Sequence, residues 1–315
     1  MNFQVKESIL VIGLGGVGSK LASQTRDIVN SDCLIISNDK NDLREDCQSI
    51  LVSTDSVINP SVHLIRGSTY KVLGEIRSKI SKYSTIILMA NLAGKAGQAI
   101  SPVISEMCKE SQVGLISFAI MPFKYEKERI FNSGIALKRV REDSKCTIVL
   151  DNDSLLESNP DLSPKECYKI GNSAITHVVK SLEKTEISAM TNILSASKEN
   201  EDLEDSLRDS LKMLYGNASP NSVKRSILYV SGGENVPIGI LNSISAITSG
   251  VLNESCTQVN LSSSDESKVV MLSSIQGMTK FDNYDPLGII PQENTLDWSN
   301  PDCSIDCKLD LYQLE

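Results

Sequence analysis

Short apolar runs alternate with longer amphipathic stretches over the first half of the chain. The runs have the length and the β-branched content of buried strands, and they predict strands at Ser8–Ile12, Cys33–Ser37, Ser61–Ile65, Thr85–Ala90, Val113–Ala119 and Cys146–Leu150. The stretches between them predict helices at Gly16–Val29, Tyr70–Ser81, Gln98–Glu110 and Asn132–Glu142. Strands that alternate with helices predict an α/β fold, in which helices cover both faces of a parallel sheet.

A long helix is predicted at the start of the second half. Ser163–Glu166 is a capping box with proline at the first helical position. Apolar or small residues then recur with a 3.6-residue period from Cys167 to Leu182, and the pattern extends to about Ile193. After a charged segment, the pattern predicts a smaller α/β layer with a helix at Ile238–Ser249 and strands at Arg225–Val230, Thr257–Leu261 and Lys268–Ile275.

The chain of 315 residues is about twice the length of a typical domain, so we expect it to divide. The predicted parts are an α/β domain over residues 1–162, a central helix over 163–197, a smaller α/β domain over 198–284 and a tail over 285–315. The tail carries seven acidic residues against Lys308 alone, which is typical of a segment that docks on a partner.

Composition argues against several classes of function. The net charge of −9 disfavours nucleic-acid binding, which needs clustered lysine and arginine. With only 2 histidines, and no C-x-x-C pair among the 8 cysteines, the sequence predicts no metal centre. No apolar run approaches the ~18 residues of a membrane helix, and the polar first residues are unlike a signal peptide. We therefore expect a cytoplasmic protein with no direct membrane insertion.

A glycine-rich loop follows the first predicted strand. Gly13-Leu14-Gly15-Gly16-Val17-Gly18-Ser19 leads directly into a helix. Glycine lets the backbone turn tightly and present N–H groups to a phosphate, and a helix N-terminus adds partial positive charge. The loop alone fits a Rossmann dehydrogenase with Asp32 or Asp39 on the ribose, an E1-like adenylating enzyme, or FtsZ with its G-x-G-G-x-G loop.

Later segments resemble FtsZ in their order and spacing. Ser37–Leu43 resembles N-T-D-A-Q-A-L, and Ala90–Ala99 stands at the superfamily signature G-G-G-T-G-T-G. Met121–Glu126 resembles K-P-F-x-F-E, whose acid meets the ribose, and Asn152–Leu156 resembles P-N-D-x-L-L. Asn172 matches the residue that recognises guanine. Over nearly all of residues 8–277, the chain thus resembles a divergent, archaeal-type member of the FtsZ/tubulin superfamily.

The resemblance implies a site for GTP or GDP, with or without Mg²⁺, and no protein-built metal site. It implies head-to-tail assembly with further copies of this chain or with an intact FtsZ-type protein, and a docking partner for the acidic tail. The implied nucleotide contacts are Gly13, Leu14, Gly15, Gly16, Gly18, Ser19, Asp39, Asn91, Gly94, Lys95, Ala96, Gly97, Gln98, Pro122, Glu126, Arg129, Asn152 and Asn172.

The signature loop departs from the family pattern. Only Gly94 and Gly97 keep the glycine positions, and the threonines become Ala96 and Gln98. Because threonine hydroxyls bind the terminal phosphates in the family, their loss implies weak triphosphate binding. Lys95 is new in this position, and it fits either a phosphate ligand or a solvated surface lysine.

The catalytic loop departs further. In FtsZ the long helix ends in N-x-D-x-x-D, whose carboxylates polarise the attacking water in the next subunit. Counting from Asn172 predicts a degenerate loop, with Asn192 retained and Leu194 and Ser197 in place of the acids. In that register Ile193 and Leu194 would lie on the head-to-tail contact.

A shorter helix would instead place Glu183 and Glu186 at the acid positions. The first register predicts a filament-forming protein in which hydrolysis is reduced or lost. The second predicts an active GTPase with a rewired site. A Rossmann-type or E1-like enzyme explains only the first glycine loop.

Overall fold

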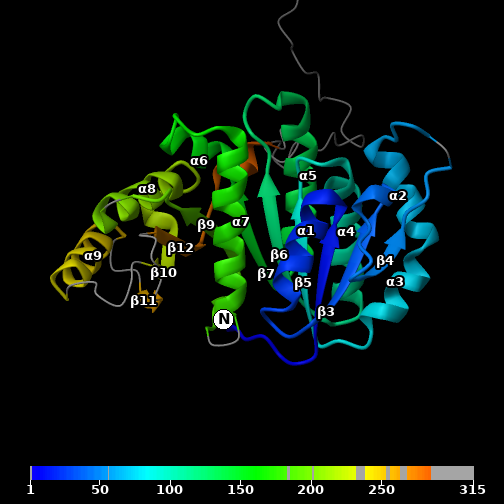
Figure 1. Ribbon diagram of the computed structural model, residues 1–315, viewed down its shortest axis with the longest axis horizontal. Coiled ribbons are helices and arrows are strands. Elements are labelled where there is room, and N and C mark those ends of the chain that lie inside the picture. The colour runs from blue at the N-terminus through cyan, green and yellow to red at the C-terminus, as the bar shows by residue number, and fades with distance from the viewer. Residues whose placement is uncertain are drawn as a thin grey trace, which may run out of the picture.

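One continuous sheet carries the fold. The computed structural model describes residues 2–55, 57–182, 185–200, 202–231, 238–252, 256–262 and 268–284. Ten strands pair in the order β11-β10-β12-β9-β7-β6-β5-β2-β3-β4 (Figure 1). Their bounds are β2 (Ile9–Leu14), β3 (Asp32–Ser37), β4 (Gln48–Leu51), β5 (Thr85–Asn91), β6 (Gly114–Met121), β7 (Cys146–Asp151), β9 (Thr191–Ala196), β10 (Val223–Ser231), β11 (Cys256–Ser262) and β12 (Lys268–Ile275).

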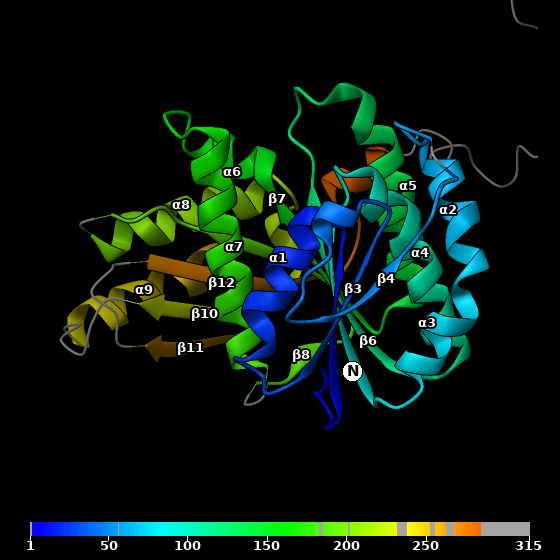
Figure 2. The ribbon, with the colours of Figure 1, turned by 45° about the vertical axis from the view of Figure 1, so that its right-hand side comes forward.

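Helices cover both faces of the sheet, as the α/β pattern predicts. The α-helices are α1 (Gly15–Arg26), α2 (Val62–Lys71), α3 (Leu73–Ile80), α4 (Lys95–Glu110), α5 (Lys127–Asp143), α6 (Asn152–Ser158), α7 (Pro164–Ser181), α8 (Leu203–Tyr215) and α9 (Ile238–Val251). The described residues also form the 3₁₀ turns η1 (Lys40–Asp42), η2 (Pro220–Ser222) and η3 (Lys280–Tyr284). Helices α1 and α7 lie side by side on one face, and α4 and α5 lie together on the other (Figure 2).

Alternation along the strands supplies both faces with apolar side chains. In β2, Ile12 and Leu14 join the hydrophobic cluster under α4, and Val11 joins the cluster under α1 and α7. Strands buried on both sides need apolar residues at nearly every position, which explains the unbroken runs in the sequence. The two clusters include residues from β4 at one edge of the sheet to β10, next to β11 at the other, so the core extends along nearly the whole sheet.

Parallel strands bring their carboxyl ends to one edge. Strand β2 pairs in parallel with β3 on one side and with β5 on the other, and β5, β6 and β7 continue in parallel. The chain leaves β2 toward β3 through α1 and returns on the other side at β5. Open α/β sheets bind ligands at such a change of direction.

The predicted strand at Ser61–Ile65 is wrong. Ser61 is the N-cap of α2, where its hydroxyl accepts a hydrogen bond from the backbone N–H of Leu64 at 3.2 Å. The buried residues of α2, Ile65, Ser68 and Thr69, have helical spacing, and two of them are polar, so the apolar pattern misses them. Strand β4 escapes prediction because it is an edge strand of four residues, of which Gln48 and Ser49 are polar, too short to give a periodic pattern.

The predicted central helix over 163–197 is also wrong in extent. Helix α7 begins at the predicted capping box but ends at Ser181, and Thr191–Ala196 is strand β9. Strand β9 runs parallel to β7 and antiparallel to β12. Its alternating side chains Ile193 and Leu194 enter opposite hydrophobic clusters and are fully buried. They therefore lie on no subunit surface, contrary to the expectation for a head-to-tail contact.

A small ribbon ties the start of the chain to the segment after α7. Strand β1 (Asn2–Phe3) pairs antiparallel with β8 (Ile187–Ser188), near the lower end of α7 in Figure 1. The predicted acidic tail, 285–315, lies outside the described residues. No helix in the described part of the chain is long and apolar enough to cross a bilayer.

Truncating Leu194 tests the position of β9. Because Leu194 is 0% exposed, Leu194→Ala should lower the free energy of unfolding by about 2–5 kcal/mol. Leu261→Ala, at a leucine that is 59% exposed on β11, should change it by less than about 0.5 kcal/mol. Chemical denaturation followed by circular dichroism measures both. Equal, small losses would mean that Leu194 stands in an exposed loop.

Candidate functional site

The loops after β2, β3 and β5 meet at the carboxyl edge of the sheet. A Cβ atom placed on Gly15, the first residue of α1, would lie 3.0 Å from Cβ of Ala96 in the first turn of α4. A Cβ on Gly16 would lie 2.7 Å from Oδ1 of Asp42, which follows β3. Segments distant in sequence thus converge where the glycine loop enters α1.

Backbone contacts account for the glycines. Gly15 has φ +64°, a left-handed conformation that favours glycine. A Cβ on Gly13 would lie 2.5 Å from the carbonyl oxygen of Gly18, and one on Gly18 would overlap the Met89 carbonyl of β5. A Cβ on Gly97 would overlap the Asn91 carbonyl. Because these obstacles are backbone atoms, they cannot turn aside as a side chain would.

Two helix N-termini at this edge lack side-chain caps. Helix α1 follows Leu14 and helix α4 follows Gly94, and neither N-cap residue supplies a side-chain hydrogen bond. The first turns of both helices also contain no acidic residue. Each helix therefore presents unpaired N–H groups and a positive dipole end close to the other. This arrangement fits an anion such as a di- or triphosphate.

Two buried polar atoms near these loops have no hydrogen-bond partner among the described residues. They are the hydroxyl of Ser19, in the first turns of α1, and Oδ1 of Asn152, at the start of α6. The amide nitrogen of Asn152 donates to the Met121 carbonyl at 3.3 Å. Unpaired buried polar atoms are costly, so both positions fit a site where a ligand supplies the missing partner.

A pocket of about 870 Å³ lies between α1 and α7. We call it the α1–α7 pocket; its lining includes Lys20, Gln24, Tyr168, Lys169, Asn172 and Thr176. Asn172 is half-buried, and its amide can donate and accept. Tyr168 stands one turn before Asn172, and burial raises the pKa of its phenol. The pocket has the size and polarity of a site for a nucleoside base.

Other implied contacts already have partners. Asp39 caps η1 through the backbone N–H of Asn41 at 2.9 Å. Glu126 pairs with Arg129 at 2.6 Å through one oxygen and accepts the N–H of Phe123 through the other at 3.1 Å. Pro122 is buried between β6 and this turn. Asn91 ends β5, and its Oδ1 accepts the N–H of Ala93 at 3.0 Å.

Lys95 and Gln98, which depart from the family signature, make contacts within the fold. The Lys95 ammonium bonds Oδ1 of Asn59 at 2.6 Å and the Pro60 carbonyl at 3.1 Å. The Gln98 side chain is 3% exposed, and its amide nitrogen reaches Arg129 O and Ser133 Oγ on α5. Gln98 therefore serves the α4–α5 contact and leaves no exposed polar group for a ligand.

The predicted degenerate catalytic loop does not exist. Asn192, Leu194 and Ser197 are buried in or directly after β9. The Asn192 amide bonds the Ser188 and Met190 carbonyls, and the Ser197 hydroxyl accepts the N–H of Val269 on β12. Of the alternative acids, Glu183 lies outside the described residues. Glu186 is exposed beside β8, where it accepts a hydrogen bond from Asn2 at 2.9 Å.

Comparisons with known proteins agree with this geometry. The Tubulin/FtsZ family GTPase domain matches residues 8–160. The chain is 24% identical over 191 residues to cell division protein FtsZ 2 of Halobacterium salinarum, covering 56% of this chain and 47% of the relative. It is 22% identical over 249 residues to FtsZ 1 of Thermococcus kodakarensis, covering 75% and 64%. The matched regions thus span about half to two thirds of these relatives.

Solved structures share the whole fold. An empty FtsZ dimer from M. jannaschii has a TM-score of 0.68 at 16% identity, covering 86% of this chain and 88% of that one. CetZ2 from Haloferax volcanii, a GTPγS-bound protofilament, has a TM-score of 0.68 at 16% identity, covering 90% and 98%. Residues 8–160 thus match the GTPase domain of the Tubulin/FtsZ family, and the chain has the fold of FtsZ and CetZ. The loops after β2, β5, β6 and β7 all lie within the matched residues.

Sequence reasoning missed several residues of this FtsZ-like site. Lys20 and Gln24 lie on one side of α1, four residues apart, and line the α1–α7 pocket with Asn172. A helical wheel from Gly16 would have placed them on the same side. Asp42, beside Gly16, also accepts a hydrogen bond from Ser37 at 2.6 Å. Among the described residues, no cluster of three or more metal-binding side chains occurs.

Lys280, the first residue of η3, supports the site through an ion pair with a buried carboxylate. Its ammonium lies 2.5 Å from Asp151, which ends β7 and is 0% exposed, and 3.0 Å from the hydroxyl of Ser154. Burial raises the pKa of the Asp151 carboxyl, and the Lys280 ammonium and the Ser154 hydroxyl act in the opposite direction. No sequence motif joins Lys280 to Asp151, because their contact depends on the tertiary fold.

Removing Lys280 should destabilise the FtsZ-like fold in a pH-dependent way. Lys280→Met leaves Asp151 buried without its counter-ion, which should cost about 3 kcal/mol near neutral pH. The pKa of Asp151 then lies further above its unfolded value, so the folded variant binds a proton as the pH falls. The deficit in melting temperature should therefore shrink between about pH 7 and about pH 5.

Thermal unfolding of both proteins across this range measures the effect. Lys71→Met is the control, because its ion pair with Asp55 is at the surface, with the side chains of Lys71 and Asp55 67% and 79% exposed. It should change the melting temperature little at any pH. A deficit for Lys280→Met that grows on acidification would contradict the assignment.

Proposed function

We propose that this chain binds a guanine nucleotide at the carboxyl edge of its sheet and assembles head to tail, with GTP hydrolysis reduced or lost. The observation that carries the proposal is the meeting of two uncapped helix N-termini, α1 and α4, at the glycine loops. Donors arranged in advance bind phosphate with little reorganisation. The family's GTPase domain and the GTPγS-bound CetZ2 support the choice of nucleotide.

Each part of the nucleotide has a candidate partner in the chain. Backbone N–H groups of Gly15, Gly16 and Ala96 would hold phosphates, and Glu126 would meet the ribose. Asn172 would recognise the base in the α1–α7 pocket. When bound, Mg²⁺ would neutralise phosphate charge, and Asp42 is the carboxylate beside the glycine loop. Without hydroxyls at Ala96 and Gln98, the terminal phosphate gains few contacts.

A dehydrogenase site fits less well. Asp32 begins β3, at the amino edge of the sheet, and its carboxylate accepts the hydroxyl of Tyr83 at 2.5 Å. Asp39 uses its carboxylate to cap η1. Neither acid is therefore available to hold a ribose in the way that a Rossmann enzyme requires.

Exposed groups at the carboxyl edge and at the opposite, amino edge of the sheet support self-association. At the nucleotide edge, Ile58 is fully exposed one residue before Asn59, which bonds Lys95. At the opposite edge lie Glu186 and the β1–β8 ribbon. A heterologous contact between the two edges would repeat along a filament. Further copies of this chain, or an intact FtsZ-type protein, would fit as the neighbour.

The competing hypothesis is an active GTPase. The short connection from α7 to β9 favours the register in which Glu183 and Glu186 replace the catalytic acids. In a head-to-tail filament, Glu186 would approach the neighbour's nucleotide. Water attack on the γ-phosphate depends on positioning and electrostatic stabilisation, so one exposed carboxylate could restore part of the rate.

Calorimetry tests nucleotide binding. We expect GDP to bind with a dissociation constant of about 10 µM or below, corresponding to about −7 kcal/mol. GTP should bind no more tightly than GDP, and ATP much more weakly. Asn172→Ala should weaken GDP binding about tenfold, because a buried amide contact to the base is lost. Asn132→Ala, at an exposed position on α5, is the matched control. Failure of GDP and GTP to bind would refute the site.

Phosphate release tests hydrolysis in samples whose assembly is checked by sedimentation. We expect turnover near the background rate, since loss of one catalytic donor alone costs about 10²–10³ in rate. Glu186→Gln should then change nothing. Ordinary family turnover that falls with Glu186→Gln, but not with Glu75→Gln at an exposed site on α3, would favour the active GTPase instead.

A further inference from the structure

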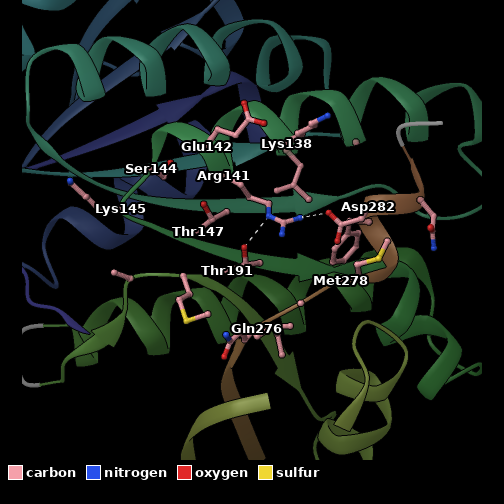
Figure 3. A pocket seen from close by; sticks show the side chains of 18 residues that line it. Lys138, Arg141, Glu142, Ser144, Lys145, Thr147, Thr191, Gln276, Met278 and Asp282 are labelled. Carbon is pink, nitrogen blue, oxygen red and sulfur yellow. Dashed lines mark hydrogen bonds and ion pairs between the residues drawn. The ribbon is translucent and has the colours of Figure 1, made fainter. Parts of the chain in front are cut away.

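A second pocket lies away from the nucleotide site. It has a volume of about 820 Å³ and lies between α5, the first residues of β7 and β9, and the segment after β12 (Figure 3). It shares no lining residue with the α1–α7 pocket. We call it the α5 pocket. Nothing in the proposed nucleotide chemistry uses it.

The α5 pocket combines an apolar wall with basic residues. Leu137, Ile275 and Phe281 line it and are buried, and Met278 lines it with 71% of its surface exposed. Figure 3 shows Arg141 pointing toward Asp282 and Thr191, with Lys138 and Lys145 extending to either side of it, from α5 and the turn after it. An exposed apolar side chain beside basic groups fits an occupant that carries both acidic and apolar residues.

One cation of the pocket is fixed in place. Arg141 donates to Asp282 at 2.7 Å and to the Thr191 hydroxyl at 2.9 Å, so it joins α5 to η3 and to β9. Asp282 in turn accepts the N–H and the hydroxyl of Thr279. These contacts hold the wall made by the segment after β12. Lys145 is exposed at the pocket. Of the two acidic residues just before it, Asp143 pairs with Lys109 at 2.7 Å, and Glu142 lines the pocket.

The chain itself leads from this wall into its acidic tail. Phe281, Asp282 and Asn283 line the pocket, and the tail begins two residues later at Asp285. The tail contains seven acidic residues and one basic residue, Lys308, together with Leu, Ile and Trp residues. A few residues at about 3.3 Å each reach across a pocket of this size. Attachment also gives the tail an effective concentration on the order of millimolar.

We propose that the acidic tail, residues 285–315, docks in the α5 pocket of its own chain. Acidic side chains would meet Lys145, and apolar side chains would cover Met278 and the buried wall. The tail that the sequence predicts to bind a partner would thereby have an intramolecular site as well. Partner binding would then compete with this docking, which is a form of regulation independent of the nucleotide proposal.

The single tryptophan reports on the tail. Trp298 is the only tryptophan of the chain and lies in the tail, so its fluorescence in the full-length protein needs no label. We expect emission at shorter wavelength, and weaker quenching by acrylamide, than for a synthetic peptide of residues 285–315. Lys145→Glu should weaken docking about tenfold, because an attraction becomes a repulsion at a partly exposed site. Acrylamide quenching of Trp298 in this variant should then approach that of the peptide. Added salt should also increase the quenching, because it screens the attraction between tail and pocket.

Two further variants complete the test. Met278→Gln removes apolar contact at an exposed position and should also increase quenching. Lys82→Glu, an exposed lysine between α3 and β5, makes the same charge change away from the pocket and should leave quenching unchanged. Circular dichroism establishes that each variant is folded.

Three results would overturn the proposal. If acrylamide quenches Trp298 equally in the protein and in the peptide, the tail does not dock. Protection that survives Lys145→Glu and Met278→Gln means that it docks elsewhere. Protection that is lost on dilution means that the tail occupies the pocket of a second copy.

Discussion

The position of β9 is the constraint on which the rest of the molecule depends. Its backbone pairs with β7 on one side and with β12 on the other, so it joins the parallel strands of the first half of the chain to β10, β11 and β12. Ile193 and Leu194 enter the hydrophobic clusters on opposite faces. Because the sheet is continuous through β9, movement between the two halves would break backbone hydrogen bonds and open both clusters. The site loops therefore rest on one rigid sheet.

Sequence pattern predicted the strands that are buried on both faces and failed where that signal is absent. Strands β2, β3, β5, β6 and β7 are unbroken apolar runs, and their predicted bounds differ from the observed ones by a few residues at most. The sequence pattern predicts helix at β9 because the 3.6-residue apolar period that begins at Cys167 can be extended through Ile193. Only the pairing with β7 and β12, which is a tertiary property, distinguishes the two. The edge strand β4 carries polar residues and gives no periodic signal.

The order of the site loops could be predicted, but the orientation of their side chains could not. Glycines such as Gly18 and Gly97 are required by backbone contacts, so a motif locates them. Gln98 instead turns into the α4–α5 contact, and Lys95 turns toward Asn59. Lys280 contacts Asp151 across more than a hundred residues of sequence. Such contacts depend on which helices lie next to each other, which the sequence alone does not specify.

The segment after β12 connects features that otherwise lie apart. Within three residues, Lys280 reaches the buried Asp151 at the carboxyl edge of the sheet, Phe281 lines the α5 pocket, and Asp282 holds Arg141. Tyr284 packs against Gly134 on α5, since a Cβ atom placed on Gly134 would lie 2.5 Å from Cβ of Tyr284. A displacement of η3 would therefore disturb both the α5 pocket and the support of Asn152, next to Asp151. An occupant of the α5 pocket would contact the same short turn that holds Lys280 against Asp151, so η3 is shared by the pocket and the carboxyl edge of the sheet.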